Sequence, residues 1–396
     1  MNLVRPIAAP GRPAAATLGL IDCDIHPRVR DLAEFRPFLS DAAWHRLATY
    51  GIHARHGFAK GYPFPKAAPL ACRRDAWPPG GGPPASDLPF LQEQLLDQHG
   101  IDIGVLNPLQ PSGQGDVNDG LSVALARAVN EWQVEHWLRH EPRLRGSIVV
   151  PYEDGAAAAA EIRHWAGDER FCHVLLMSRT CEPLGRARYW PIWQAAAECG
   201  LPVGIHAFGY SGHAMTNGGW PSFYVEEVQE HATSAQAQVA SMVVEGVFDR
   251  FPALRVIMIE CGFAWMPPLA WRLDGAWKRL RDEVPHLTRA PSEIMREHVY
   301  VSTQPIEEPE RPEHLLDTMG WIGWDRILFA SDYPHWDFDD PRLAIPSFIP
   351  EAKRAAMAAD PAWQAYLKRA AEAGYLVHME NRIIKPAPHW TPLPGM

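Results

Sequence analysis

The amino-acid sequence predicts an α/β fold, a (β/α)8 TIM barrel with a long insertion after strand one and a C-terminal helical extension. Three observations predict it. Eight short apolar runs rich in Val and Ile recur along the chain, as expected for strands buried on both faces. Patterns with helical spacing separate most of these runs. The length of 396 residues suits one barrel with insertions. Together they favour eight parallel strands alternating with helices.

The elements follow one another in the order that such a barrel needs. The expected strands are 21–26, 103–108, 147–151, 172–177, 202–206, 255–260, 298–303 and 327–332. The helical patterns between them cover 121–140, 155–165, 190–199, 233–248 and 264–280. Gly200 follows one of these patterns and Pro142 follows another, and both residue types commonly end helices.

Three segments do not fit a minimal barrel. Residues 1–18 are expected to form a flexible leader, because prolines and an arginine interrupt an apolar part that is too short for a signal sequence. The barrel itself is expected over 19–345. The insertion at about 53–90 is rich in proline and glycine, which predicts a lid or binding loop. Residues 346–396 are expected to form a helical extension and a proline-rich tail.

Bulk composition argues against several kinds of partner. The net charge is −10, from 37 basic and 47 acidic residues, and no run rich in Lys or Arg stands out. Nucleic acid and anionic membrane are therefore not expected as partners. No other apolar stretch approaches the roughly 18 residues of a membrane span. The six cysteines form no CxxC pair, which predicts reduced thiols in a cytoplasmic protein.

Polar residues close several of the expected apolar strands. Asp24 and His26 close the first strand, His206 the fifth, Glu260 the sixth and Asp332 the eighth. The carboxyl ends of barrel strands meet at one face, where active sites lie. We therefore expect these side chains to line one depression at the carboxyl ends of the strands, here called the cup.

Four of these residues have the chemistry of metal ligands. Asp24 and His26 are two positions apart on one strand, so both side chains point inward. With His206 and Asp332 they offer two imidazoles and two carboxylates, which suit Zn²⁺ first and Mn²⁺ or Mg²⁺ as alternatives. A single histidine is more often hydrogen-bonded in a core, and a single aspartate more often caps a helix. Their joint occurrence at three strand ends favours one divalent metal ion.

Other candidates lie where the mouth of the barrel is expected. His335 follows Asp332 by three residues and is a candidate for catalysis. Arginines of the insertion could clamp a substrate carboxylate, although a solvated loop arginine is the simpler interpretation of each. A tryptophan in the same region could line an aromatic pocket, although packing is the commoner role. The substrate-binding candidates are Arg55, Arg73, Arg74 and Trp336.

The segments IDCDIHP, LPVGIHAFG, FPALRVIMIECGFAWMP and ILFASDYPHWD resemble the signature segments of the amidohydrolase-related superfamily of metal-dependent barrel enzymes. The resemblance covers about residues 20–345, and ENR at 380–382 resembles the family's C-terminal helix. The chain is most similar to the branch with the decarboxylases of aminocarboxymuconate semialdehyde, gamma-resorcylate and carboxyvanillate. That branch also holds hydrolases and a hydratase.

The resemblance implies one metal ion held by Asp24, His26, His206 and Asp332. Asp24 departs from the HxH form of the first motif, and a carboxylate there is similar to the resorcylate and carboxyvanillate decarboxylases. Glu260 stands where family members often have a histidine that acts as acid or base. It is therefore expected either to carry out the proton transfer or to orient another group, such as His335.

Two mechanisms use the same residues. In a decarboxylase, the metal would hold the substrate carboxylate, and Asp332 or Glu260 would deliver a proton to the carbon that loses CO₂. In a hydrolase, Asp332 would accept a proton from metal-bound water that attacks an amide, ester or C–C bond. We expect non-oxidative decarboxylation of an aromatic or conjugated carboxylic acid, with hydrolysis as the alternative and an inactive binding barrel as the second. The family resemblance and the C-terminal segment also imply a homodimer or a larger homo-oligomer.

Overall fold

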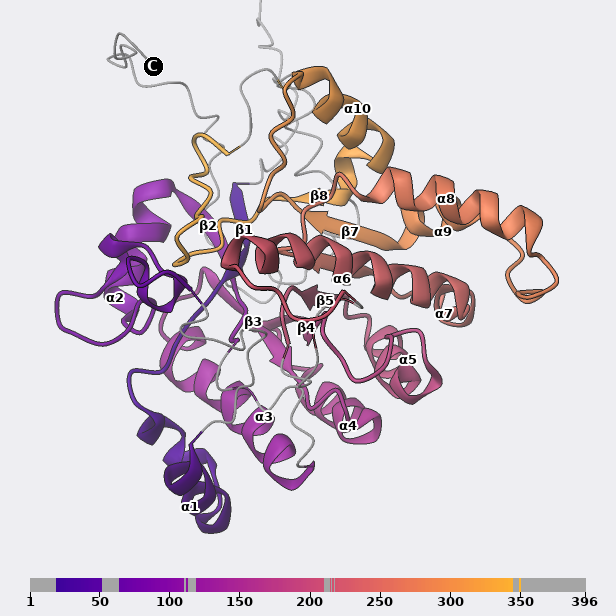
Figure 1. Ribbon diagram of the computed structural model, residues 1–396. Coiled ribbons are helices and arrows are strands. Elements are labelled where there is room, and N and C mark those ends of the chain that lie inside the picture. The colour runs from indigo at the N-terminus through magenta and orange to yellow at the C-terminus, as the bar shows by residue number, and fades with distance from the viewer. Residues whose placement is uncertain are drawn as a thin grey trace, which may run out of the picture.

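The computed structural model describes residues 19–51, 64–109, 119–209 and 218–344, together with positions 112, 214, 216 and 349. Their eight strands form one parallel sheet in the order β1 to β8, at the centre of a ring of helices (Figure 1). The strands are β1 Leu20–Ile25, β2 Ile101–Leu106, β3 Leu144–Val149, β4 Phe171–Met177, β5 Val203–His206, β6 Val256–Ile259, β7 Val299–Ser302 and β8 Ile327–Leu328.

The sheet closes on itself where the chain leaving β8 meets β1. The backbone N–H of Cys23 donates to the carbonyl of Phe329 at 3.0 Å, and that of His26 donates to the carbonyl of Tyr333 at 2.8 Å. Ile25 and Tyr333 also form a parallel bridge. The predicted (β/α)8 barrel is therefore confirmed, with the carboxyl ends of its strands on one face.

Helices follow the strands much as the sequence predicts. The expected helices at 155–165 and 190–199 have the observed bounds, and the one expected at 233–248 begins earlier, at Tyr224. The start is fixed by the Glu226 carboxylate, which accepts the N–H of Phe223 at 2.8 Å. The helices are α1 Asp41–Tyr50, α2 Leu88–Leu91, α3 Asp119–Gln133, α4 Gly155–Trp165, α5 Trp190–Cys199, α6 Tyr224–Val244, α7 Val247–Arg250, α8 Met266–Arg279, α9 Pro291–His298 and α10 Pro312–Ile322.

A buried carboxylate joins two helices to the sheet. Glu161 of α4 accepts hydrogen bonds from Arg127 at 2.7 Å, Asn130 at 2.9 Å and Trp165 at 2.7 Å. Asn130, on α3, also bonds the carbonyl and the N–H of Val149, each at 2.9 Å. Because every donor around this carboxylate is paired with it, burial of its charge is offset, and the network fixes α3 and α4 against β3.

Part of the predicted lid lies against the loop that follows β8. The backbone N–H of Arg73 donates to the carbonyl of Pro334 at 3.0 Å, and that of Trp336 donates to the carbonyl of Ala71 at 2.8 Å. The insertion therefore reaches the mouth of the barrel, and its role as a lid stays a prediction. Arg55 lies outside the described residues.

Other features of the sequence remain predictions. The leader at 1–18 and the extension at 346–396 lie outside the part of the chain that the structure describes, so the expected division into three regions stays a prediction.

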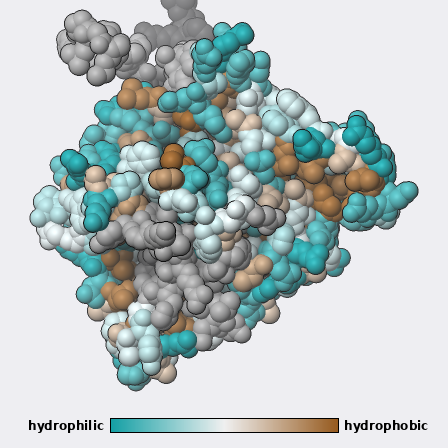
Figure 2. Space-filling view, viewed as in Figure 1, coloured by the Kyte–Doolittle hydropathy of each residue, from teal (hydrophilic) through white to brown (hydrophobic). Residues whose placement is uncertain are grey.

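Within the described part, none of the helices combines the length and apolar character needed to cross a bilayer. Figure 2 shows hydrophobic surface over the projecting helix α8, and Leu280, just past the end of that helix, is exposed. The expected homo-oligomer also stays a prediction.

Candidate metal centre

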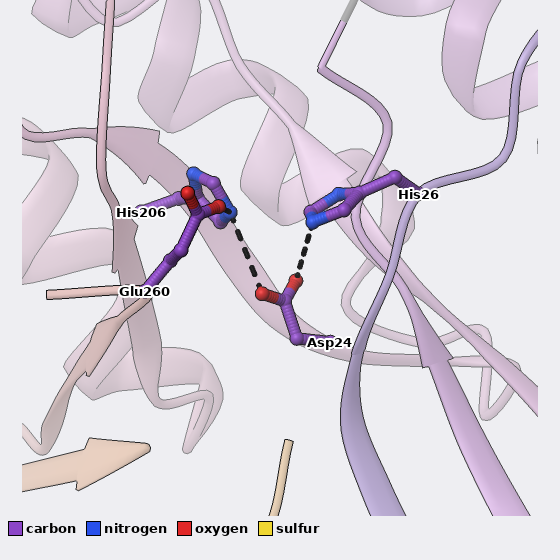
Figure 3. Close-up of side chains that lie close together, drawn as sticks. All are labelled: Asp24, His26, His206 and Glu260. Carbon is purple, nitrogen blue, oxygen red and sulfur yellow. Dashed lines mark ion pairs between the residues drawn. The ribbon is translucent and has the colours of Figure 1, made fainter. Parts of the chain in front are cut away.

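Six titratable side chains meet at the carboxyl ends of the strands. Asp24 and His26 come from the end of β1, His206 ends β5, and Glu260 follows β6, and Figure 3 shows these four side chains pointing toward one another. The loop after β8 adds Asp332 and His335 to the cluster. All six residues are at most 7% exposed. Three of the predicted ligands, Asp24, His26 and His206, therefore lie together in a buried site, and Asp332 joins them through its contact with His26.

The distances between these groups describe two overlapping sets of four: Asp24, His26, His206 and Glu260 in one, and His26, Glu260, Asp332 and His335 in the other. The Nε2 atom of His26 lies 2.9 Å from Oδ1 of Asp332 and 3.3 Å from Oδ1 of Asp24. The Nε2 atom of His206 lies 2.9 Å from Oε2 of Glu260 and 3.5 Å from Oδ2 of Asp24. Both imidazoles therefore direct the same ring nitrogen toward the carboxylates.

The other ring nitrogen of each histidine is held by a backbone carbonyl. Nδ1 of His26 donates to the carbonyl of Asn107 at 2.9 Å, and Nδ1 of His206 donates to that of Ala207 at 2.7 Å. A carbonyl can only accept, so Nδ1 carries the proton and a neutral ring presents its lone pair at Nε2. Such a hydrogen bond behind the ring is typical of histidines that bind metals. Asn107 also donates to Asp24 Oδ1 at 2.8 Å and so fixes that carboxylate as well.

Several buried atoms of this cluster have the chemistry of a cation's ligands. Despite their short separations, these atoms are misaligned for hydrogen bonds, and among the described residues none has a hydrogen-bond partner. Buried polar atoms are normally paired, so such a gathering needs an explanation. A metal ion at the centre supplies it, because each atom offers a lone pair. The unpartnered atoms are Asp24 Oδ2, His26 Nε2, His206 Nε2 and Glu260 Oε2.

The electrostatics point the same way. Burial by itself would lower the pKa of His206, but the carboxylates of Asp24 and Glu260 outweigh it and raise that pKa to about 10. Burial would raise the pKa of Asp24, but His26 and His206 hold it well below its usual range. The site therefore strongly favours positive charge among its carboxylates. A divalent cation can supply that charge in place of protons on the imidazoles.

The loop after β8 adds a hydrogen-bonded pair. His335 Nδ1 lies 2.5 Å from Asp332 Oδ1. The centroids of the His335 and His26 imidazole rings are 4.7 Å apart. Gln304 donates to Asp332 Oδ2 at 3.2 Å, so both carboxylate oxygens of Asp332 have a neighbour that orients them. Asp332 also has a φ of +59°, a costly conformation for a residue other than glycine. Such strain is common where a side chain must be aimed at a site.

Several residues of the site were missed or given little weight in the sequence. Asn107 directly follows β2, at the same face of the barrel as the other strand ends. That position in the sequence is the feature from which its place in the site could have been predicted. His231 on α6 places Nδ1 3.7 Å from Oε1 of Glu260 and packs edge-on against Phe208. A helix that begins at Tyr224 brings it there, and the sequence pattern did not place that start.

The substrate-binding candidates lie around the mouth, and their role stays a prediction. The guanidinium of Arg73 makes two hydrogen bonds to Asp75, at 2.9 and 2.6 Å, and lies over the Phe338 ring. Arg74 is exposed. The indole N–H of Trp336, a residue that is 49% exposed, donates to the Tyr224 hydroxyl at 3.0 Å. This contact joins the β8 loop to the start of α6 at the rim of the cup.

Comparisons with known sequences give a consistent result. A family model described as amidohydrolase matches residues 21–370 of this chain. The gamma-resorcylate decarboxylase of Polaromonas sp. (strain JS666 / ATCC BAA-500) is 28% identical over 270 residues, which cover 64% of this chain and 79% of that relative. The gamma-resorcylate decarboxylase of Rhizobium radiobacter is 27% identical over the same shares of the two chains.

Solved structures share the fold. A dihydroxybenzoic acid decarboxylase from Polaromonas sp. JS666, with bound manganese and the inhibitor 2-nitroresorcinol, has a TM-score of 0.61. It is 22% identical, and the match covers 91% of this chain and 99% of that one. The 5-carboxyvanillate decarboxylase of Sphingomonas paucimobilis has a TM-score of 0.62 at 21% identity, with 89% and 99% covered. At these identities the likeness establishes the barrel fold.

Proposed function

This chain belongs to the amidohydrolase family, and on that premise we propose that it is a metal-dependent, non-oxidative decarboxylase of an aromatic carboxylic acid. The observation that carries the proposal is the buried convergence of unpartnered imidazole and carboxylate atoms at the barrel mouth. The similarity to gamma-resorcylate decarboxylases supports decarboxylation as the reaction. We propose the cytoplasm as its compartment, since all six cysteines are free thiols.

The metal would be held by Asp24, His26, His206 and Asp332. Bound there, a divalent ion would act as a Lewis acid for the substrate carboxylate and a neighbouring hydroxyl oxygen. The manganese in the dihydroxybenzoic acid decarboxylase supports a divalent ion in this chain too. Zn²⁺, the ion first expected from the four-residue set, stays a prediction.

The chain's own residues would move the proton. When the bond from the ring carbon to the carboxylate breaks, CO₂ leaves and the electron pair stays on the ring carbon, which must then take a proton. Asp332 and His335 form the buried hydrogen-bonded pair that is placed to deliver it. We assign Asp332 as the group that faces the substrate and His335 as the group that orients it.

The rim would select and enclose the substrate. Arg73 lies at the mouth, and an exchange of its Asp75 partner for a substrate carboxylate would preserve its bidentate pairing. Tyr224, at the start of α6, and Trp336, in the loop after β8, would cover an aromatic ring. Burial raises the pKa of Tyr224, and the nearby Asp337 and Glu260 carboxylates add to the rise, so its hydroxyl stays neutral beside the cup.

The test is a direct product assay. The purified protein, loaded with Mn²⁺ or Zn²⁺, would be incubated with 2,6-dihydroxybenzoate, with 5-carboxyvanillate and with benzoate as the hydroxyl-free control. Released CO₂ and the decarboxylated ring would be measured. Turnover of a hydroxybenzoate that the metal-free protein lacks would support the proposal. Cleavage of aryl esters or amides without CO₂ release would favour the hydrolase, and a fully metal-loaded protein inactive on both panels would favour a binding barrel.

A further inference from the structure

We infer that Glu260 is a fifth ligand of the metal ion and that its carboxylate gives the site a preference for Mn²⁺ over Zn²⁺. The inference deepens the proposed function, because it concerns the same metal centre. It assigns to Glu260 a role different from the proton transfer that its position in the sequence suggests.

The first argument is the place of Glu260 among the converging donors. Two groups of potential ligand atoms lie mutually within 4.8 Å in the described part of the chain. His26 and Glu260 are the members that the two groups share. One group adds Asp24 and His206, and the other adds Asp332 and His335. Glu260 is therefore close to every one of the four residues expected to hold the ion.

The second argument is the distance to His206. Two donors that each lie about 2.1 Å from one ion can be at most about 4.2 Å apart. Oε2 of Glu260 lies 2.9 Å from Nε2 of His206, well within that limit. Nδ1 of His206 is already bonded to the Ala207 carbonyl, so Nε2 is the nitrogen that would bind the ion. A carboxylate oxygen beside it meets the same ion.

The third argument concerns the geometry of the contact between Glu260 and His206. A carboxylate that only neutralised a protonated His206 would accept an aligned hydrogen bond from Nε2–H. Neither Oε2 of Glu260 nor Nε2 of His206 has a hydrogen-bond partner among the described residues. Their 2.9 Å contact is therefore not an aligned hydrogen bond, and two ligands of one cation can have this separation.

The fourth argument is the backbone conformation at Glu260. Glu260 has a φ of +55°, which L-residues other than glycine rarely adopt. Its N–H donates to the hydroxyl of Ser302 on β7 at 3.1 Å, which holds the turn after β6 in place. Such strain persists where the surrounding structure requires it, and it is concentrated at functional sites.

The metal preference follows from the donor set. With Glu260 the site offers three carboxylates and two imidazoles. The other four residues alone offer two carboxylates and two imidazoles. Carboxylate-rich sites with more than four ligands suit Mn²⁺, whereas Zn²⁺ is satisfied by four. Removal of Glu260 should therefore weaken Mn²⁺ binding more than Zn²⁺ binding.

The experiment compares metal affinities. Glu260→Gln keeps the shape of the side chain and removes its charge. Glu227→Gln is the matched control, because Glu227 is a buried carboxylate on α6, 2% exposed, that belongs to neither donor group. Apo-proteins prepared with a chelator would be titrated with Mn²⁺ and Zn²⁺ against a chelating dye. Free Mn²⁺ would be counted independently by electron paramagnetic resonance.

We expect Glu260→Gln to lose at least about tenfold in Mn²⁺ affinity and clearly less in Zn²⁺ affinity, while Glu227→Gln matches the wild type. A smaller Mn²⁺ loss in folded Glu260→Gln would overturn the fifth ligand, and equal losses for both ions would overturn the preference. If the variant does not fold, a crystal structure of Mn²⁺-loaded wild type decides. A Glu260 oxygen within about 2.4 Å of the ion supports the inference, and a longer distance overturns it.

These measurements do not use turnover. A protein that binds Mn²⁺ through Glu260 and releases no CO₂ would contradict the proposed reaction and leave the ligand assignment standing. If the wild-type protein releases CO₂ and Glu260→Gln binds metal as tightly as the wild type, the proposed reaction stands and the ligand assignment is contradicted.

Discussion

The Nδ1 atom of His335 lies 2.5 Å from Oδ1 of Asp332, three residues before it in the loop after β8. The backbone N–H of His335 also donates to the carbonyl of Asp332 at 2.8 Å, which closes the turn that brings the two side chains together. The pair is buried, so the hydrogen bond is shielded from water and orients Asp332 at the metal centre.

Asp332→Asn should lower kcat by about 10²–10⁴-fold, because the amide cannot exchange the proton that the ring carbon needs. Its melting temperature should stay near that of the wild type. Asp325→Asn, in the turn before β8, is the control and should keep full activity. CO₂ release under saturating substrate and metal measures the effect. An active Asp332→Asn enzyme would remove this residue from the proton path.

His335→Gln should have a smaller effect, a decrease of about 10–100-fold in kcat, since it removes the group that orients Asp332 and leaves the carboxylate in place. The Mn²⁺ content should stay near one ion per chain. Steady-state kinetics together with elemental analysis distinguish a residue that orients Asp332 from a residue that binds the metal. A loss of metal in place of activity would make His335 a ligand.

His206→Ala should abolish stable metal binding, because it removes the imidazole whose Nε2 faces Asp24 and Glu260. His45→Ala, an exposed residue of α1, is the matched control. Elemental analysis after purification without added metal gives the occupancy. Equal metal content in the two variants would exclude His206 from the ligand set.

Tyr224→Phe should raise KM by about 2–10-fold and leave kcat nearly unchanged, because the hydroxyl that accepts the Trp336 indole N–H holds the rim in place. Trp336→Phe removes the donor of the same bond and should resemble it. Kinetics on the aromatic substrate would measure both. A fall in kcat at constant KM would instead place Tyr224 in the chemical step.

Glu161→Gln should lower the free energy of unfolding by about 2–4 kcal/mol, because it removes a buried charge that Arg127, Asn130 and Trp165 all bond. Glu198→Gln, in an exposed ion pair with Arg163, should leave that free energy unchanged. Urea unfolding followed by fluorescence compares the variants. Equal midpoints for both would mean that the α3–α4 network adds no stability.

Much of this protein is determined by its sequence. Apolar runs without alternation define buried parallel strands, and their order along the chain defines which strand ends face one cup. Asp24 and His26 are two residues apart at the end of β1, His206 ends β5, and Asp332 lies in the loop that follows β8. These four positions could therefore be predicted together, because strand periodicity and barrel closure place them without any knowledge of the loops.

The tertiary structure decided how these groups act on one another. Asn107 and the Ala207 carbonyl fix which nitrogen of each histidine faces the cup, and no pattern in the sequence encodes that choice. Glu260 and Asp332 stand in the cluster with positive φ values, at +55° and +59°. Such conformations are set by packing and hydrogen bonds between segments distant in the chain. Local sequence preferences determine strands and helices, but only those long-range contacts determine the directions of the side chains at their ends.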